Sequence, residues 1–200
     1  VYFSPVITPE KVLELFRLVD KELPGKVAIK LHSGEKGNQN FLKPEFWKPV
    51  IDHVGGTVVE CNTAYGGGRA DTESHLKAAA DHGFTAIAPV EILDAEGEAE
   101  LPIEGGKHLT FDIVGKGYLK YDFTVVLSHF KGHPMGGYGG ALKQLSIGLA
   151  SSFGKAYIHG AGEPEKKWTA DHDSFLMAMA DAAKSVVDYF EGKIVYINVM

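Results

Sequence analysis

The chain has 200 residues, of which 44% are hydrophobic, and a net charge of −6, so it is suited to one sizeable core. Its basic residues are dispersed, and no apolar run approaches the roughly 20 residues that span a bilayer. The sequence therefore predicts neither a nucleic-acid partner nor membrane insertion. The first residues lack the features of a signal peptide, which makes the cytoplasm the expected location.

Strand-like and helix-like segments alternate along the chain. Helices are predicted from Thr8, the expected N-cap, through an apolar stripe that reaches Leu23, and then over 45–54, 71–82, 141–150 and 175–190. Strands are predicted over 26–31, 57–61, 85–90, 124–128, 155–158 and 194–199. This alternation predicts an α/β fold with a mainly parallel sheet and helices on both faces.

The segment 94–114 interrupts the alternation, since it has no helical stripe, and we predict a small β insertion there. No internal repeat or linker divides the chain, so we expect residues 1–200 to form a single α/β domain. The last residues, 194–200, look like a buried strand with no polar tail after it. For that reason we also expect the domain to be a fragment of a longer chain.

The predicted strands share a feature at their carboxyl ends, where open parallel sheets bind ligands. Five of them lead into polar, mostly glycine-bearing segments, and three of these segments begin with or contain a histidine, namely His32, His129 and His159. Turn chemistry explains the glycines but not the histidines. We therefore predict a site for a small anionic molecule. The residues expected to bind this ligand or cofactor are Gly34, Glu35, Lys36, Gly37, Asn38, Asn62, Thr63, Tyr65, Arg69, Lys131, Gly136, Gly137, Gly139 and Gly140.

Three of these side chains have an alternative role. Arg69 is expected to clamp a carboxylate or phosphate with two N–H groups, or instead to cap a helix at the surface. Glu35 is expected to bind a cation or to orient His32, and Tyr65 to hydrogen-bond the ligand or to pack.

The stretch "SHFKGHPMGGYGGALK", residues 128–143, joins a predicted strand to a predicted helix. Its glycines would let backbone amides approach an anion, the helix N-terminus would add partial positive charge, and Lys143 would add a full charge. The alternative is a sharp turn with close packing of helix on sheet. We call residues 136–140 the glycine elbow.

His129 and His133 are four residues apart, but Gly132 and Pro134 argue against a helical metal-binding pair. An imidazole suits proton transfer near neutral pH, so acid–base catalysis by His129, His133 and His32, with Lys143, is the first hypothesis. Hydrogen-bonding loop histidines are the second. A metal site, completed by His32 or His159, is the third.

Cys61 is the only cysteine, so an internal disulfide is excluded. An iron–sulfur cluster usually takes about four thiolates, and this chain alone cannot supply them. Because Cys61 ends a predicted buried strand, a core role is more common there than a nucleophile.

The segments "SGEKGN", "VECNTAYGGGR", "HLKAAADHGF", "LSHFKGHPMGGYGGALK" and "GLASSFGK" resemble the family catalogued as domain of unknown function 362, over essentially the whole chain. Members of that family commonly carry a ferredoxin-like iron–sulfur segment. The resemblance thus implies a ferredoxin-like module in cis or in trans, and a place in anaerobic redox or cofactor metabolism.

A second resemblance covers only "HPMGGYGGALK", which is similar to an element of the nickel-pincer lactate racemases. It implies that His133 transfers a proton and that Lys143 holds a nickel-type cofactor, with His32 a loose analogue of the second histidine. The leading hypothesis is therefore proton-transfer chemistry of the racemase or isomerase type. Two alternatives stay open: an accessory scaffold of an iron–sulfur electron-transfer protein, and a divalent-metal enzyme using His32, Glu35, His129 and His133.

Overall fold

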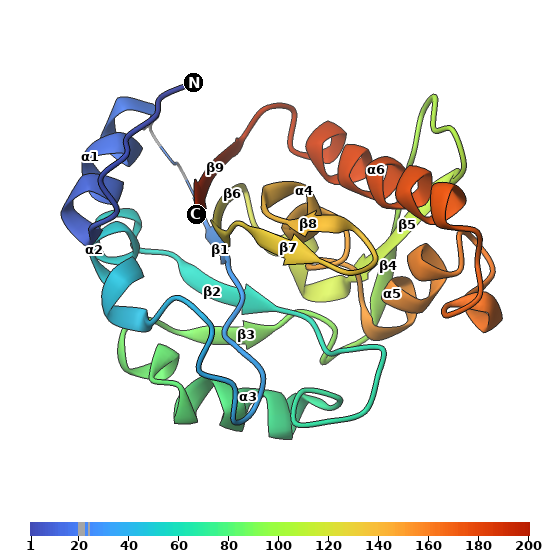
Figure 1. Ribbon diagram of the computed structural model, residues 1–200, viewed down its shortest axis with the longest axis horizontal. Helices are drawn as coiled ribbons and strands as arrows, with labels where there is room; N and C mark the ends of the chain where they lie inside the picture. Colours follow the sequence, from blue (N-terminus) through green and yellow to red (C-terminus); the bar gives the residue numbers. More distant parts are fainter. Residues whose placement is uncertain (20–22, 24) are drawn as a thin grey trace.

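The centre of the molecule is a parallel sheet of five strands in the order β3-β2-β1-β6-β9 (Figure 1). The computed structural model describes residues 1–19, 23 and 25–200. The strands are β1 (Val27–Lys30), β2 (Thr57–Glu60), β3 (Val90–Ile92), β6 (Phe123–His129) and β9 (Ile194–Val199). The chain builds outward from β1 to β3 on one side and then from β6 to β9 on the other. Such a reversal of strand order leaves a crevice at the carboxyl ends of the central strands.

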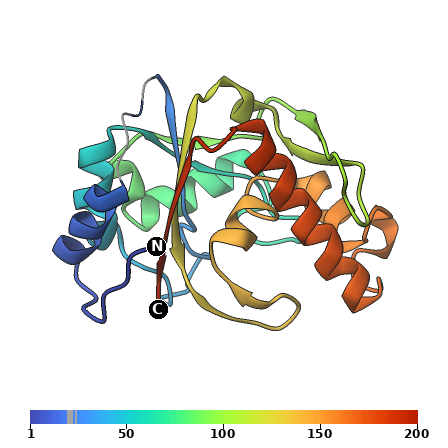
Figure 2. The same ribbon diagram turned by 90° about the horizontal axis from the view of Figure 1, so that it is seen from above.

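Helices cover both faces of the sheet, as predicted. On one face, α1 (Pro9–Val19) and α2 (Pro44–Val54) bury Phe16 and Trp47 against Ile29 of β1. On the other face, α4 (Ala141–Leu145) and α6 (His172–Tyr189) pack over the sheet, with Val186 against Ala28. Figure 2 shows the sheet edge-on between these two layers. The remaining helices are α3 (Thr72–Asp81), α5 (Ser152–His159) and the short 3₁₀ helices η1 (Phe84–Ala86), η2 (Lys116–Lys120) and η3 (Pro164–Lys166).

Two antiparallel ribbons lie outside the main sheet. The first pairs β4 (Glu98–Pro102) with β5 (Phe111–Gly115), which confirms the small β insertion. The second pairs β7 (Lys131–His133) with β8 (Gly137–Gly139), directly after β6. Stacking of Phe130 on Tyr138, with ring centroids 5.0 Å apart, holds this second ribbon together. The glycine-rich stretch is therefore largely an ordered hairpin.

Helix ends follow the signals in the sequence. The hydroxyl of Thr8 accepts a hydrogen bond from the Lys11 N–H at 3.2 Å, as an N-cap residue does. Gly83 follows α3 in the left-handed conformation, with φ of 88°, where a side chain would be strained. These local signals fix where the helices start and stop.

The prediction of a strand over 155–158 is wrong, because these residues lie in α5. Ser151 caps that helix by accepting a hydrogen bond from the Gly154 N–H at 2.8 Å. Gly154 lies so close to β5 of the β insertion that a Cβ on Gly154 would be 1.9 Å from the Ile113 carbonyl oxygen. The helix is thus held by a cap and by close packing, neither of which is visible in a four-residue apolar run. His159 consequently ends a helix and not a strand.

The strand predicted over 85–90 is displaced toward the C-terminus. Residues Phe84–Ala86 form η1, and β3 begins only at Val90, after Pro89, which lacks the N–H that a strand ladder uses. Glu91 therefore lies within β3 and not beyond it, where its carboxylate accepts hydrogen bonds from Lys120 and Tyr121, each at 2.6 Å.

The helix predicted over 141–150 is only half as long, since α4 ends at Leu145. The Ser146 hydroxyl donates to the Leu142 carbonyl at 2.9 Å, and the chain then turns so that Ala150 forms a bridge with Val114. This contact with the β insertion is distant in sequence, so the apolar spacing alone overestimates the helix.

Candidate functional site

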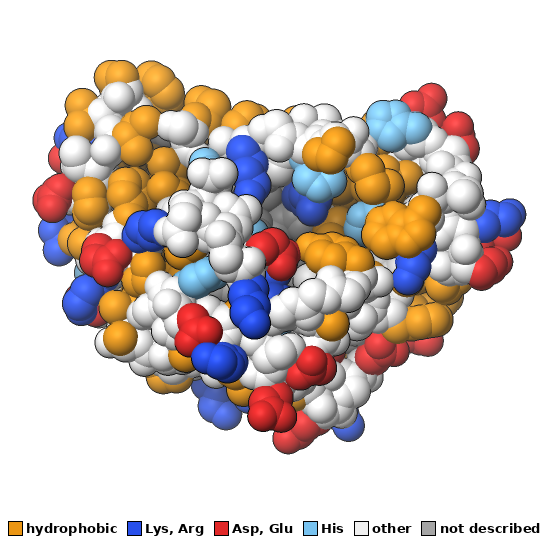
Figure 3. Space-filling view, turned by 60° about the horizontal axis from the view of Figure 1, so that its bottom comes forward, with side chains coloured by type: hydrophobic (Ala, Val, Ile, Leu, Met, Phe, Trp, Pro, Cys, Tyr) orange, Lys and Arg blue, Asp and Glu red, His pale blue; other side chains and the backbone are white. Residues whose placement is uncertain are grey.

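A cavity of about 400 Å³ opens where the sheet reverses its order, beside the carboxyl ends of β1, β2 and β6. Figure 3 shows a hollow on this face of the molecule with lysine, arginine and histidine side chains around it. All four residues predicted to be catalytic line the cavity, together with His159 and eight of the residues predicted to bind the ligand. These are His32, His129, His133 and Lys143, and Glu35, Asn38, Thr63, Tyr65, Arg69, Lys131, Gly139 and Gly140.

Six residues predicted to bind the ligand do not line the cavity, namely Gly34, Lys36, Gly37, Asn62, Gly136 and Gly137. The side chain of Asn62 turns toward α3, where it accepts from His75 Nδ1 at 3.3 Å and donates to Thr72 at 3.2 Å. The other five belong to turns of the two loops that carry Glu35 and His133. Proximity in sequence to a strand end is thus not enough to place a side chain in the cavity.

Several other polar or aromatic residues of the cavity were not predicted, among them Lys30, Glu60, Lys155 and Trp168. Lys30 and Glu60 are each the penultimate residue of a predicted strand, and a charge in that position of a largely apolar run is a signal that could have found them. Lys155 was hidden by the wrong strand prediction. For Trp168 we find no signal in the sequence.

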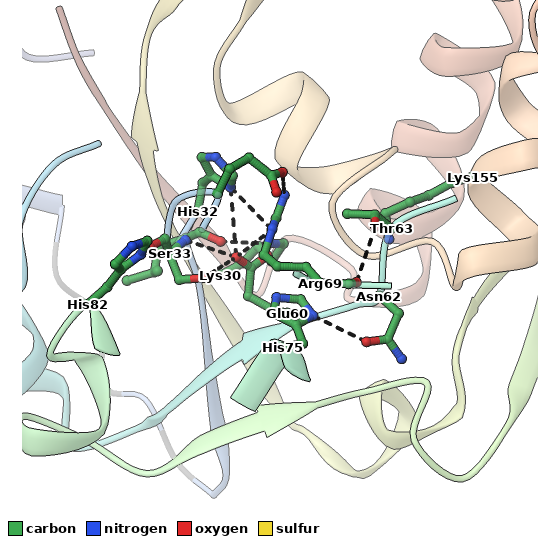
Figure 4. Close-up of polar contacts among 12 residues, drawn as sticks. Lys30, His32, Ser33, Glu60, Asn62, Thr63, Arg69, His75, His82 and Lys155 are labelled. Atoms are coloured by element: carbon green, nitrogen blue, oxygen red, sulfur yellow. Dashed lines mark hydrogen bonds and ion pairs between the residues drawn. The ribbon is translucent and has the colours of Figure 1, made fainter. Parts of the chain in front are cut away.

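The base of the cavity is an ion-pair network of Lys30, Ser33, Glu60 and Arg69, which we call the buried network (Figure 4). One Glu60 oxygen accepts from Lys30 Nζ at 2.6 Å. The other accepts from the Ser33 N–H and hydroxyl at 2.9 and 3.0 Å, and lies 3.4 Å from Arg69 Nη1. Burial alone would raise the pKa of Glu60, but Lys30 and Arg69 hold it well below its usual range. Glu60 is therefore a fixed carboxylate whose hydrogen-bonding capacity is nearly filled.

Lys131 and Lys143 differ from the buried network, because the side-chain ammonium of neither residue makes an ion pair or a hydrogen bond with another described residue. Burial, together with the charge of Lys155, lowers the pKa of Lys143 to about 8. The cavity lining as a whole carries five lysine or arginine side chains against two carboxylates. The excess of positive charge favours an anion. We call Lys131 and Lys143 the unpaired set.

Two histidines of the cavity have opposite hydrogen-bonding polarity. Nδ1 of His133 accepts from the backbone N–H groups of Met135 and Gly136, at 3.3 and 3.0 Å, so in the neutral ring the proton is on Nε2. Nδ1 of His159 donates to the Lys155 carbonyl at 2.7 Å, so its Nε2 carries a lone pair. Burial and the charge of Lys143 lower the pKa of His133 to about 4, and burial lowers that of His159. At neutral pH, His133 is therefore a donor and His159 an acceptor.

The tautomers of the other two predicted catalytic histidines, His32 and His129, are not fixed by a backbone hydrogen bond in the same way. His32 Nδ1 lies 3.5 Å from Arg69 Nη1, and burial, followed by the charge of Arg69, lowers the His32 pKa to about 3. His129 Nδ1 is buried without a hydrogen-bond partner among the described residues. Within residues 1–19, 23 and 25–200, no three His, Cys, Asp or Glu side chains are grouped closely enough to hold a metal ion. Although His32, His129, His133 and His159 share the cavity, they do not form a preassembled metal site.

The glycine elbow leads into a short helix, and one N–H group at the N-terminus of that helix already has a partner. α4 has only five residues, and the Ala141 N–H already donates to the Asn198 side chain at 2.9 Å. A Cβ on Gly140 would lie 2.9 Å from the Phe130 ring, so this glycine is needed for close packing. Close packing therefore accounts for Gly140, and Lys143 in α4 is the main positive charge that the stretch 128–143 brings to the cavity beside Lys131.

Cys61 lies in the wall of the cavity, but burial raises the pKa of its thiol to about 12. Its Sγ donates to the Leu149 carbonyl at 3.3 Å. A thiol in this state is a core residue and a poor nucleophile.

The arrangement of strands and helices is similar to that of two solved structures. The lactate racemase apoprotein from Thermoanaerobacterium thermosaccharolyticum matches with a TM-score of 0.57 and 14% identity, covering 97% of this chain and 49% of that one. A protein from Thermotoga maritima matches with a TM-score of 0.61 and 14% identity, covering 98% of this chain and 52% of that one. The chain thus spans about half the length of either protein, and at this identity the likeness concerns the fold.

Other comparisons bear on the chain as a whole. None of the helices in residues 1–19, 23 and 25–200 has the length and apolar character needed to cross a membrane. No curated protein sequence matches the chain. Residues 27–200 match the family described as domain of unknown function, DUF362, and the chain therefore belongs to that family.

Proposed function

We propose that this domain binds a small organic anion in the cavity and exchanges a proton with it through His133 and His159. The observation that carries the proposal is the unpaired set, because Lys131 and Lys143 bring positive charge to the cavity without a carboxylate to neutralise it. Lys143 is partly buried, and such a cation without a partner is unfavourable until an anion arrives, so binding an anion relieves an existing penalty there.

The two histidines supply the second part of the proposal. An Nε2–H at His133 can donate to a carbonyl or carboxylate oxygen of the ligand, while the Nε2 lone pair of His159 can accept a hydroxyl proton. Lowered pKa values keep both rings neutral near pH 7, so each retains its tautomer. This replaces the predicted pairing of His129 with His133 by a pairing of His133 with His159.

The fold likeness to the lactate racemase apoprotein suggests a 2-hydroxy acid as the ligand, and a racemase or isomerase as the class of enzyme. Such an acid offers the carboxylate and the hydroxyl that the lysines and histidines would contact. The anionic part of a cofactor could pair with Lys131 and Lys143 in the same way. The ferredoxin-like module and the role as an iron–sulfur accessory stay predictions, which elemental analysis of the purified protein will test.

Calorimetric titration with sodium L-lactate and with sodium sulfate tests the binding site. We expect wild-type protein to bind at least one of these anions, and Lys143→Ala to bind it at least about tenfold more weakly. Lys77→Ala is the matched control, since Lys77 is 70% exposed on α3 and does not line the cavity. Equal affinity in wild-type protein and Lys143→Ala, or absence of binding in wild type, would contradict the site.

Long-range nitrogen–proton NMR of the histidine rings tests the proton-exchange pair. We expect the Nε2–H tautomer for His133 and the Nδ1–H tautomer for His159 at pH 7. His108, whose Nε2 contacts the Ala161 carbonyl at 3.0 Å outside the cavity, provides an internal reference for the Nε2–H tautomer. Finding the same tautomer in His133 and His159 would remove the donor–acceptor pair.

A further inference from the structure

Arg69 lies between two carboxylates that are held very differently. Its side chain is 6% exposed and contacts Glu60 through Nη1 and Glu35 through Nη2. Glu60 is 4% exposed and is also bonded to Lys30 and Ser33. Glu35 is 34% exposed, and among the described residues its carboxylate is bonded, apart from Arg69, only to the hydroxyl of Tyr65, at 2.8 Å. Of the two carboxylates, only Glu35 is free to leave.

The contact between Glu35 and Arg69 is also incomplete. An arginine can bind a carboxylate with two parallel N–H groups, but Glu35 engages Nη2 through Oε1 alone, and the same oxygen accepts from Tyr65. Arg69 Nε is buried without a partner among the described residues. A buried donor that lacks a partner is unfavourable, so this arrangement leaves Arg69 less than fully satisfied.

The backbone around Glu35 does not hold the carboxylate in place. Residues 31–43 connect β1 to α2 without strand or helix, and the turn at Glu35 is closed by one backbone hydrogen bond, from the Asn38 N–H to the Glu35 carbonyl at 2.9 Å. Rotation of the Glu35 side chain away from Arg69 would break none of the bonds of the buried network. Both Glu35 and Arg69 line the cavity, so an entering ligand meets this pair.

We infer that Glu35 is an internal stand-in for the ligand: its carboxylate occupies the cavity side of Arg69, and an organic carboxylate that enters the cavity displaces Glu35 and pairs with Arg69. This inference rests on the proposed function, which it extends by assigning the ligand's carboxylate to Arg69. Glu35 is then a specificity-determining residue, because only an anion that pairs with Arg69 better than Glu35 does will replace it.

Displacement predicts a proton linkage in addition to an effect on affinity. Burial would raise the pKa of Glu35, but the hydrogen bond and charge of Arg69 lower it, and release from Arg69 removes that lowering. The released carboxylate would therefore bind protons more readily than the paired one. Ligand binding at mildly acidic pH should take up protons, and affinity should rise as pH falls toward the usual pKa of a glutamate, about 4.3.

The experiment compares sodium L-lactate binding by wild-type protein, Glu35→Gln and Glu14→Gln, using calorimetry at pH 7. Glu35→Gln retains the size of the side chain but removes the charge that competes for Arg69, so we expect about three- to tenfold tighter binding. Glu14→Gln is the matched control, because Glu14 pairs with Lys11 on the exposed surface of α1, and its affinity should equal that of wild type. Weaker or unchanged binding by Glu35→Gln would overturn the inference.

The outcomes of these titrations separate this inference from the proposed function. Suppose that lactate binds wild-type protein, that Lys143→Ala weakens this binding, and that Glu35→Gln does not tighten it. The proposed anion site is then supported, and the inferred role of Glu35 is contradicted. If neither wild type nor Glu35→Gln binds lactate, both the proposed lactate site and the role of Glu35 are contradicted. Should Glu35→Gln fail to fold, titrations of wild type at pH 5 in two buffers of different ionisation enthalpy decide the matter: proton uptake supports displacement, and its absence overturns it.

Discussion

The buried network and the unpaired set lie in one cavity and both contain lysine, yet they are stabilised in opposite ways. Lys30 is 1% exposed, but its charge is matched by Glu60, and Glu60 is in turn bonded to Ser33. Lys143 has no such partner among the described residues, and burial lowers its pKa. A charge whose partner is built into the fold contributes to structure, whereas a charge without one is available to a ligand.

The largest expected effect comes from breaking the buried network. Glu60→Gln leaves the buried cation Lys30 without a compensating charge, and Arg69 with Glu35 alone, so we expect the free energy of unfolding to fall by about 3–5 kcal/mol. Urea denaturation at pH 7 measures the change.

Glu91→Gln is the control for this variant, because Glu91 also forms an ion pair with a lysine, but its side chain is 27% exposed and that of its partner Lys120 is 49% exposed. The pair is screened by water, so we expect a change within about 1 kcal/mol. Similar losses in both variants would show that burial does not distinguish the two ion pairs.

The second effect has the opposite sign and concerns a buried carboxylate, Asp112, that has no ion-pair partner among the described residues. Asp112 is fully buried, accepts from the Ile113 N–H at 2.8 Å and the Ser185 hydroxyl at 3.2 Å, and burial raises its pKa to about 7. The unfolded chain releases this proton near pH 4 and the folded chain only near pH 7. Stability therefore decreases as pH rises through that window.

Asp112→Asn should remove this loss. We expect the variant to exceed wild type in free energy of unfolding by up to about 4 kcal/mol at pH 8, and to equal it near pH 4. Urea denaturation at the two pH values gives the difference. A variant that is less stable than wild type at pH 8 would mean that the ionised carboxylate is itself needed.

The smallest effect concerns the unpaired set and its dependence on pH. Because the pKa of Lys143 in the free protein is about 8, an anion that needs its charge must bring a proton with it above that pH. We expect sulfate affinity to be constant near pH 7 and to fall by up to about tenfold per pH unit above 8. Lys143→Arg, which keeps its charge throughout, should show no such decrease. A decrease of the same size in that variant would assign the titration to another group.

Much of the fold follows from local pattern. The β-branched runs that became β1, β2, β6 and β9 alternate with segments whose caps, Thr8 and Gly83 among them, are visible in the sequence. The wrong predictions fall where a distant contact overrides a short run. Gly154 packs on the β insertion within α5, and Ala150 bridges to Val114 after α4.

The cavity was only partly predictable, and the reason is physical. A topology rule brings His32 and His129 together, because they lie at the carboxyl ends of the neighbouring parallel strands β1 and β6. No such rule tells which nitrogen of His133 carries the proton, since that depends on the backbone of the β7–β8 turn. Likewise, the pairing of Glu60 with Lys30 needs the register between β1 and β2, while each residue alone looks like the end of a strand.

The order of residues along the chain was sufficient to predict most of the alternation of strands and helices, the β insertion and the edge of the sheet where polar side chains gather. These depend on periodicity and on turn chemistry, which act between near neighbours. Which charges are matched and which are left for a ligand depends on side chains such as Glu35 and Arg69, which are distant in sequence and meet only after folding. Electrostatic energy varies with distance and burial, and both are properties of the folded chain.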